Sequence, residues 1–311
     1  MRYAKLSLML GLLVVSAVAG EAALQDKPAV AHALAPTAVF KTTETITIDG
    51  KLDESAWKQA TPVRVDYVYG KTGELSTEPR MIAKYLWDEH YLYIGYETFD
   101  KNLVAIGNGD KQGPPGKQRD GCEIWVEGKP VDVVEFFISM GDESFFWEIH
   151  QNAANQFNDI WCSIIPKDHP AYDSTMSSYG IHFGIQEYLQ DEGPYTVATG
   201  VYLKPKADGK PSTVNDDSDV DTGYTGEIRI PWAALGAPRS RQTWVTSPDN
   251  PKQRLHGPWK MEGQGMPLLA VFQNGDLKDR YHHSSPTFKG GWFHLGAAEY
   301  PRYVLRRSPA P

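Results

Sequence analysis

Hydrophobic and polar positions alternate in short runs along most of the chain, and turn-forming residues separate the runs. Residues 45–48 (TITI) alternate polar and apolar, and the following Asp-Gly pair supplies turn chemistry. Residues 81–87 and 91–99 predict two antiparallel strands joined by a polar loop over residues 88–90. Because bulky side chains occupy both faces of the second strand, we expect it in the middle of the fold, covered on both sides.

The same pattern continues toward the C-terminus. It predicts strands over residues 122–127, 133–140, 145–151, 160–165, 180–186, 195–203, 226–230, 268–273 and 303–306. Helix is expected only in two short pieces, at 53–59 with Asp53 as N-cap and at 231–235 with Gly236 at its end.

Three stretches are rich in Gly, Pro and polar residues: 108–119, 204–222 and 238–258. They predict exposed or irregular loops. Many short strands between such turns predict an all-β fold, a two-sheet antiparallel β-sandwich of jelly-roll type with long loops.

The N-terminus has the order of a secretory signal peptide. Arg2 and Lys5 precede an apolar run over residues 6–15, and small residues follow up to Ala19. The run is shorter than the roughly 20 residues that span a bilayer, so a membrane anchor is the weaker interpretation. We therefore expect a signal peptide at 1–19, a disordered leader at 20–38 and one domain at 39–311, in a secreted or periplasmic protein without a membrane anchor after cleavage.

Charge and cysteine content narrow the class further. The net charge is −8, and loss of Arg2 and Lys5 with the signal takes it to about −10. This acidity argues against a nucleic-acid partner, which requires clustered Lys and Arg. Cys122 and Cys162 are the two cysteines, and the sequence allows either one disulfide or two buried thiols.

Four stretches, in this order, resemble carbohydrate-binding module family 9 and its relatives. They are residues 48–57 (IDGKLDESAW), 83–100 (AKYLWDEHYLYIGYETFD), 120–127 (DGCEIWVE) and 227–236 (EIRIPWAALG). The resemblance implies an antiparallel sandwich that recognises oligosaccharides or the ends of polysaccharides between aromatic platforms. It also implies support of polysaccharide breakdown and, in many members, a structural Ca²⁺ ion.

The resemblance assigns candidate ligand-binding residues to this chain. Trp292, after Gly290-Gly291, corresponds to the family's second platform, whereas residues 115–119 (PGKQR) lack the aromatic of the first. Tryptophan suits such a platform because its large ring stacks on a pyranose. The polar candidates are Asp120, Glu123, Glu148, Gln151, Asn152 and Arg280.

Two other classes remain open. A glycoside hydrolase needs two carboxylates across a cleft; Glu123 with Glu148 is the pair we nominate, but no flanking motif marks it. We therefore expect no intrinsic hydrolysis. A haem-binding electron-transfer sandwich would draw its ligands from Met81, Met140, His90 and His150.

Overall fold

The computed structural model describes most of the chain after residue 34. The described residues are 35–68, 76, 80–105, 119–120, 122, 125–126, 129–139, 145–164, 181–185, 197–236, 241–260, 265–275, 282–284 and 300–307. The predicted signal peptide, Trp292, Glu123 and Arg280 lie outside these ranges.

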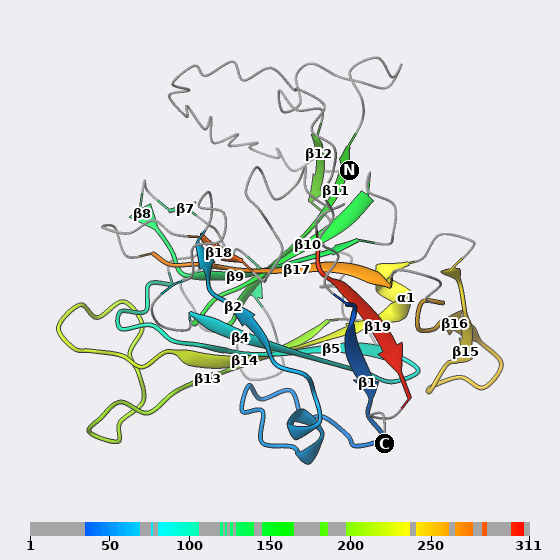
Figure 1. Cartoon of the computed structure of the whole chain (residues 1–311), viewed down its shortest axis with the longest axis horizontal. Helices are drawn as coiled ribbons and strands as arrows, with labels where there is room; N and C mark the ends of the chain where they lie inside the picture. Colours follow the sequence, from blue (N-terminus) through cyan, green and yellow to red (C-terminus); the bar gives the residue numbers. More distant parts are fainter. Residues whose placement is uncertain are drawn as a thin grey trace, which may run out of the picture. The chain divides into compact units, whose positions relative to one another are not determined.

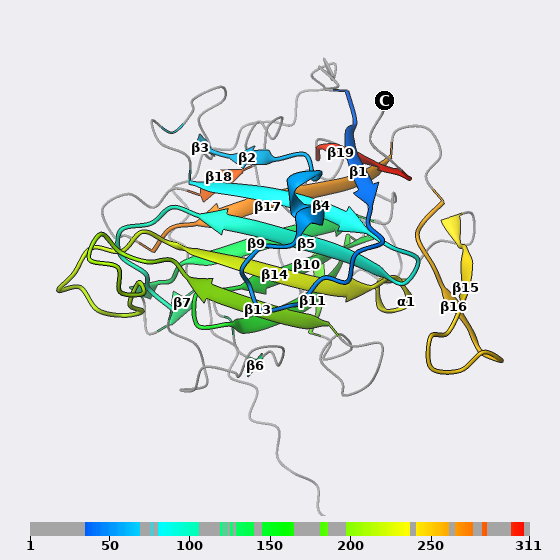
Figure 2. The same ribbon diagram turned by 90° about the horizontal axis from the view of Figure 1, so that it is seen from below.

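Two layers of strands face each other (Figures 1 and 2). The first layer has the order β12-β11-β10-β9-β17, formed by Ile181–Ile185, Gln156–Ile164, Phe145–Gln151, Val133–Ser139 and Met266–Gln273. The second has the order β19-β1-β4-β5-β14-β13, formed by Arg302–Arg306, Thr37–Lys41, Met81–Trp87, Tyr91–Thr98, Tyr224–Pro231 and Ala198–Leu203. The layers are joined by pairing between β17 and β19. The predicted β-sandwich is confirmed.

Four short strands add to the two layers. They are β2 (Val63–Val65), β3 (Tyr67–Val68), β6 (Arg119–Asp120) and β18 (His282–Ser284). Two separate hairpins complete the strands, β7 (Trp125–Val126) with β8 (Lys129–Pro130), and β15 (Trp244–Thr246) with β16 (Arg254–His256). The pairing is mainly antiparallel, as predicted, but β1 runs parallel to both β19 and β4, and β6 runs parallel to β11.

The core lies between the layers and follows the alternation of the strands. Val134, Phe136 and Ile138 of β9 point inward together with Ile94 and Tyr96 of β5, and all five are fully buried. A polar contact crosses this core, because the Tyr96 hydroxyl donates to Oε1 of Gln151 at 2.8 Å. Burial of β5 on both faces confirms its predicted central position.

The two short helices form where predicted, but the N-cap prediction was wrong. The first is a 3₁₀ helix, η1 (Ser55–Lys58), and Asp53 does not cap it. Instead the Glu44 carboxylate accepts the N–H groups of Ser55 (3.3 Å) and Ala56 (2.7 Å) and the Ser55 hydroxyl (2.7 Å). The hydrogen bond from the Ser55 hydroxyl is the largest of the interactions that lower the pKa of Glu44. The second helix, α1 (Trp232–Leu235), follows Pro231 and ends at Gly236, whose φ of +66° favours glycine.

Three details of the loops differ from the sequence prediction. Strand β1 begins at Thr37, inside the expected leader. Residues 238–258 are not wholly irregular, because they contain the β15–β16 hairpin. Residues 204–222 form a loop, as predicted, yet Asp221 is buried within it and accepts the N–H groups of Leu103 and Thr213.

Within the described residues, no helix has both the length and the apolar character needed to cross a membrane.

Candidate functional site

Strand β10 presents two ionisable side chains on the face of its sheet that points away from the core. Glu148 and His150 lie two residues apart, so they share this face, whereas Trp147 and Ile149 point into the core. Glu135 of β9 lies directly opposite His150 in the register of the two strands. We call Glu135, Glu148 and His150 the β10 cluster; all three are at most 3% exposed.

The β10 cluster is held together by hydrogen bonding and charge. His150 Nε2 lies 2.8 Å from Glu148 Oε1, and the Cys162 thiol donates to Glu148 Oε2 at 3.5 Å. Burial alone lowers the pKa of His150, but Glu148 and then Glu135 outweigh it, so the pKa is raised. An imidazolium therefore offsets the negative charge of the two buried carboxylates.

Burial, followed by the nearby Glu148 carboxylate, raises the pKa of the Cys162 thiol well above its usual range. Both Cys162 and Cys122 are buried, and they form no disulfide. Of the two possibilities left by the sequence, the structure therefore has two buried thiols.

Aromatic residues pack beside the β10 cluster on the same sheet face. Tyr300 lies just before β19 and contacts Phe137 of β9 and Phe146 of β10, with ring centroids 6.2 and 6.4 Å apart. Tyr300 is 2% exposed. The chain that leads into β19 therefore ends against the outer face of the β9–β10 sheet.

The β10 cluster is also a possible metal-binding group. Its three potential ligand atoms lie within 4.8 Å of one another. Two carboxylates and an imidazole suit a cation such as Zn²⁺ once the imidazole is neutral, but not Ca²⁺, which prefers an all-oxygen shell. The structural Ca²⁺ implied by the resemblance stays a prediction.

The other predicted site residues that are described have internal contacts. The Gln151 amide points into the core and donates to Asn155 Oδ1 (2.8 Å) and the Gly200 carbonyl (3.3 Å). Asn152 donates to Gln156 Oε1 and accepts the N–H of Ala154, which stabilises the turn between β10 and β11. Binding of a ligand by Gln151 or Asn152 remains an untested prediction.

Asp120 lies in β6, where its backbone pairs with Phe157 at the start of β11. The neighbouring Cys122 N–H donates to the Phe157 carbonyl at 3.5 Å. Asp120 and Cys122 of the predicted acidic segment therefore lie next to β11, in the sheet that carries Glu148. Glu123 itself lies outside the described residues, so the separation of the nominated Glu123–Glu148 pair is not described.

The described haem-ligand candidates occupy different surroundings. Met81 is buried in the core between the sheets, His150 belongs to the β10 cluster, and His90 lies in the β4–β5 turn with Nε2 3.0 Å from the Thr246 carbonyl. Met140 lies outside the described residues.

Sequence reasoning overlooked Glu227, a fully buried carboxylate in the second layer. It accepts the N–H groups of Asp49 (3.0 Å) and Gly50 (2.8 Å) and the indole N–H of Trp57 (2.9 Å). Glu227 therefore joins the 48–57 stretch to the 227–236 stretch. These two parts of the resemblance share one structural contact.

The comparisons with known proteins agree with this architecture. The model of the family described as carbohydrate family 9 binding domain-like matches residues 48–215, more than half of the chain. The chain therefore belongs to this family. No curated protein matches it.

Two solved structures match most of this chain, and the first, with a TM-score above 0.5, shows a similar fold. A protein from Bacteroides uniformis, described as a candidate carbohydrate-binding protein, has a TM-score of 0.52 and 14% identity over 88% of this chain and 99% of that chain. A carbohydrate-binding module of family 9 from Caldicellulosiruptor kristjanssonii, solved with cellotriose, has a TM-score of 0.45 and 12% identity over 88% of this chain and 95% of that chain.

Proposed function

We propose that this protein binds oligosaccharides or polysaccharide ends on the outer face of the β9–β10–β11 sheet. Family membership supports the ligand class. The location of the proposed binding face rests on one observation: chain segments next to the predicted ligand residues meet on this sheet. Asp120 pairs with β11, Tyr300 packs on Phe137 and Phe146, and Glu148 lies on the same face.

Trp292 is the proposed stacking platform. It precedes Tyr300 by eight residues, a length of chain that spans at most about 28 Å. Tyr300 is anchored on the outer face beside the β10 cluster, so this distance allows Trp292 to reach the same face. Glu123, one residue after buried Cys122, and Arg280, two residues before β18, are the proposed hydroxyl-bonding partners.

Glu148 is proposed as the polar floor of this face. Its carboxylate is 3% exposed, and its hydrogen bonds position it between His150 and Cys162. Because the first family platform has no aromatic counterpart in residues 115–119, we expect weak affinity, with a Kd near about 1 mM.

Calorimetric titration with cellotetraose, xylotetraose and mannotetraose tests this function. We expect the wild-type chain to bind at least one of them and Trp292→Ala to lose most of this binding, with an unchanged melting temperature. Tyr202→Ala, which removes an aromatic ring that is 40% exposed on β13, is the matched control and should bind normally. Failure of all three sugars to bind, or normal binding by Trp292→Ala, would reject the proposal.

We further propose that the chain is exported and assists polysaccharide breakdown by holding a glycan for a separate hydrolase. The basic and apolar order of residues 1–19 motivates the first part. N-terminal sequencing of exported protein should begin near Gly20. An intact Met1 in a membrane fraction would contradict export.

A further inference from the structure

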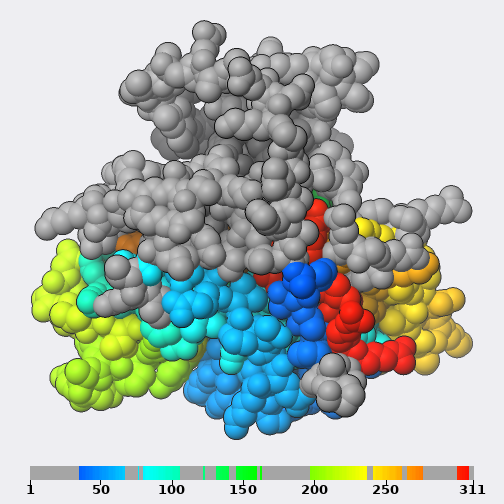
Figure 3. Space-filling model, viewed as in Figure 1, coloured from blue at the N-terminus to red at the C-terminus, as the bar shows by residue number. Residues whose placement is uncertain are grey.

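The β15–β16 hairpin carries an aromatic surface that belongs to neither the core nor the β10 cluster. Trp244 is 49% exposed, whereas the other tryptophans with described side chains are at most 8% exposed. Figure 1 shows the hairpin beside α1, at the end of the layers where the β4–β5 turn lies, and Figure 3 shows this part of the chain at the surface.

The register of the hairpin places four side chains on one face. Trp244 pairs with His256 and Thr246 with Arg254, so these side chains point the same way, while Val245 and Leu255 point to the opposite face. The Trp244 and His256 rings lie 4.4 Å apart at 30°, close to stacked. Thr246 and Arg254 are both exposed. The face therefore combines an aromatic ring with three groups that can hydrogen-bond hydroxyls.

One contact joins this hairpin to the β4–β5 turn, and others stiffen the hairpin itself. His90 Nε2 contacts the Thr246 carbonyl at 3.0 Å, and the N–H of Gly257 donates to the Thr243 carbonyl at 3.0 Å. Gly257 packs so closely on the hairpin that a Cβ there would lie 2.7 Å from Val245 Cγ1. The Trp244 ring is thus presented on a braced hairpin, which reduces the entropy lost when a ligand stacks on it.

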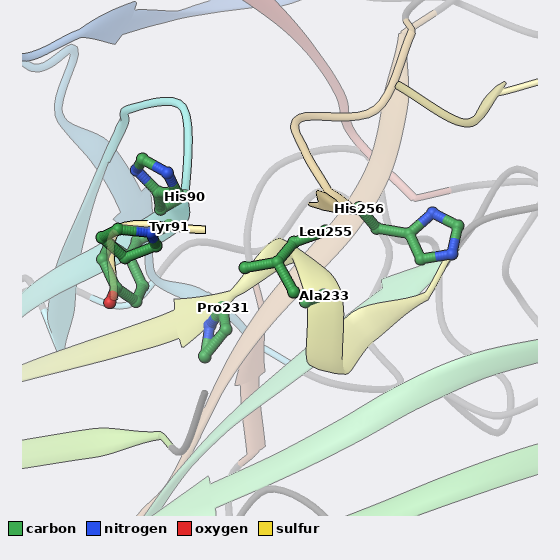
Figure 4. Close-up of a pocket in the computed structure, with 7 residues that line it drawn as sticks. His90, Tyr91, Pro231, Ala233, Leu255 and His256 are labelled. Atoms are coloured by element: carbon green, nitrogen blue, oxygen red, sulfur yellow. The ribbon is translucent and has the colours of Figure 1, made fainter. Parts of the chain in front are cut away.

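A small hollow lies between the hairpin and the sandwich. His256 lines it together with His90, Tyr91, Pro231, Ala233, Pro248 and Leu255. In Figure 4, Leu255 lies near Pro231 and Ala233, and the His256 ring is directed away from His90 and Tyr91. His256 borders this hollow, but Leu255 lies on the hairpin face opposite Trp244, so the hollow and the Trp244 face are separate surfaces.

From these contacts we infer that Trp244, with His256, Arg254 and Thr246, forms a second saccharide-binding surface, separate from the β10 face. One exposed indole ring flanked by hydroxyl-bonding groups matches the apolar face and polar rim of a pyranose. It does not match a stable protein interface, which needs a larger contiguous area. The ligand class rests on the proposed function, but the location does not, and two such surfaces would let one chain hold a polysaccharide at two points.

The test follows the indole N–H resonance of Trp244 in the full chain, assigned by its absence from Trp244→Ala. Cellotetraose, xylotetraose and mannotetraose are the probes. We expect at least one of them to shift this resonance saturably, in the wild type and in Trp292→Ala alike. Trp244→Ala should weaken the binding measured in Trp292→Ala about tenfold, or about 1.4 kcal/mol, and Trp244→Phe should restore part of it.

The outcomes separate the two sites. A Trp244 resonance unmoved by all three sugars overturns the inference, and sugar binding lost only in Trp292→Ala leaves the proposed function intact. Normal sugar binding in Trp292→Ala with a shifted Trp244 resonance overturns the proposed site and supports this one. Broadening of the resonance with protein concentration alone would identify a contact between copies of the chain and contradict the inference.

Discussion

Glu227 and Glu148 are both buried glutamates, but the two layers give them different surroundings. Glu227 on β14 meets three neutral N–H donors, from Asp49, Gly50 and Trp57. Glu148 on β10 meets an imidazole and a thiol, with a second carboxylate close by. One carboxylate joins distant segments of the fold, whereas the other belongs to a cluster of ionisable groups on the proposed binding face.

The two buried glutamates also differ in the charges around them. Burial raises the pKa of Glu227 to about 7, although its three hydrogen bonds partly oppose the shift. The β10 cluster instead contains its own cation, because Glu148 and Glu135 raise the pKa of His150. Glu227, whose partners are backbone and indole N–H groups, stabilises the fold. Glu148, whose partners His150 and Cys162 can titrate, belongs to the candidate site.

The largest expected effect is a loss of stability when the Glu227 carboxylate is removed. Glu227→Ala leaves three donors, two of them buried, without an acceptor, and we expect a loss of about 3–5 kcal/mol in the free energy of unfolding. Urea unfolding measures it. The control is Glu97→Ala on β5, whose partly exposed carboxylate pairs with Lys204 at 2.9 Å and should cost at most about 1 kcal/mol. Equal losses in the two variants would contradict the structural role assigned to Glu227.

The next effect concerns the cation of the β10 cluster. His150→Gln leaves two buried carboxylates without an imidazolium, with an expected cost of about 2–4 kcal/mol at pH 6. Because the pKa of His150 is raised in the folded state, its contribution is fully present below about pH 6.5 and is lost as the pH rises through the folded value. The difference in unfolding free energy between wild type and variant should shrink from pH 6 to pH 9. A difference that grows with pH would be inconsistent with the charged cluster.

A lower pH window distinguishes Glu227 from His150. The folded pKa of Glu227 is about 7, above its ordinary 4.5, so the stability linked to this shift is present below pH 4.5 and is lost as the pH rises through 7. Stability curves of wild type and Glu227→Gln should converge by roughly 1–3 kcal/mol between pH 4.5 and 7.5. Parallel curves would show that Glu227 does not titrate in this window.

The smallest effect is expected at the hairpin. Trp244→Ala should cost no more than about 0.5–1.5 kcal/mol of stability, because its described ring contact is the stack on His256. Trp259→Ala is the buried counterpart: this indole is 2% exposed, donates to the Gly236 carbonyl, and should cost about 3–5 kcal/mol. Thermal unfolding of both variants provides the comparison. A loss at Trp244 as large as that at Trp259 would mean that Trp244 is a core residue.

Most of the sandwich was predictable because its strands are half or fully buried. The pattern of hydrophobic and polar residues along each strand reflects this burial. The β15–β16 hairpin was missed since Pro248, Pro251 and Pro258 interrupt the pattern and three-residue strands leave little periodicity. The Glu44 cap was missed for another reason. Its carboxylate lies eleven residues before Ser55, far outside the usual local capping distance.

The candidate site was predictable only in part. Strand parity already separates Glu148 and His150 from Gln151, because odd and even positions face opposite sides. The addition of Glu135 depends on the pairing of β9 with β10, and the role of Glu227 depends on contacts about 170 residues apart. Such long-range partners cannot be read from local patterns.

Hydrogen exchange with mass spectrometry, on the free chain and on the chain saturated with its best tetrasaccharide, tests the central claim most directly. We predict slower exchange in peptides from β6, β10 and the segment that leads to Tyr300, with no change around Glu227, in residues 48–57 and β14. Protection confined to the Glu227 region, or no protection in β10 and the Tyr300 segment at saturation, would contradict the location of the binding face.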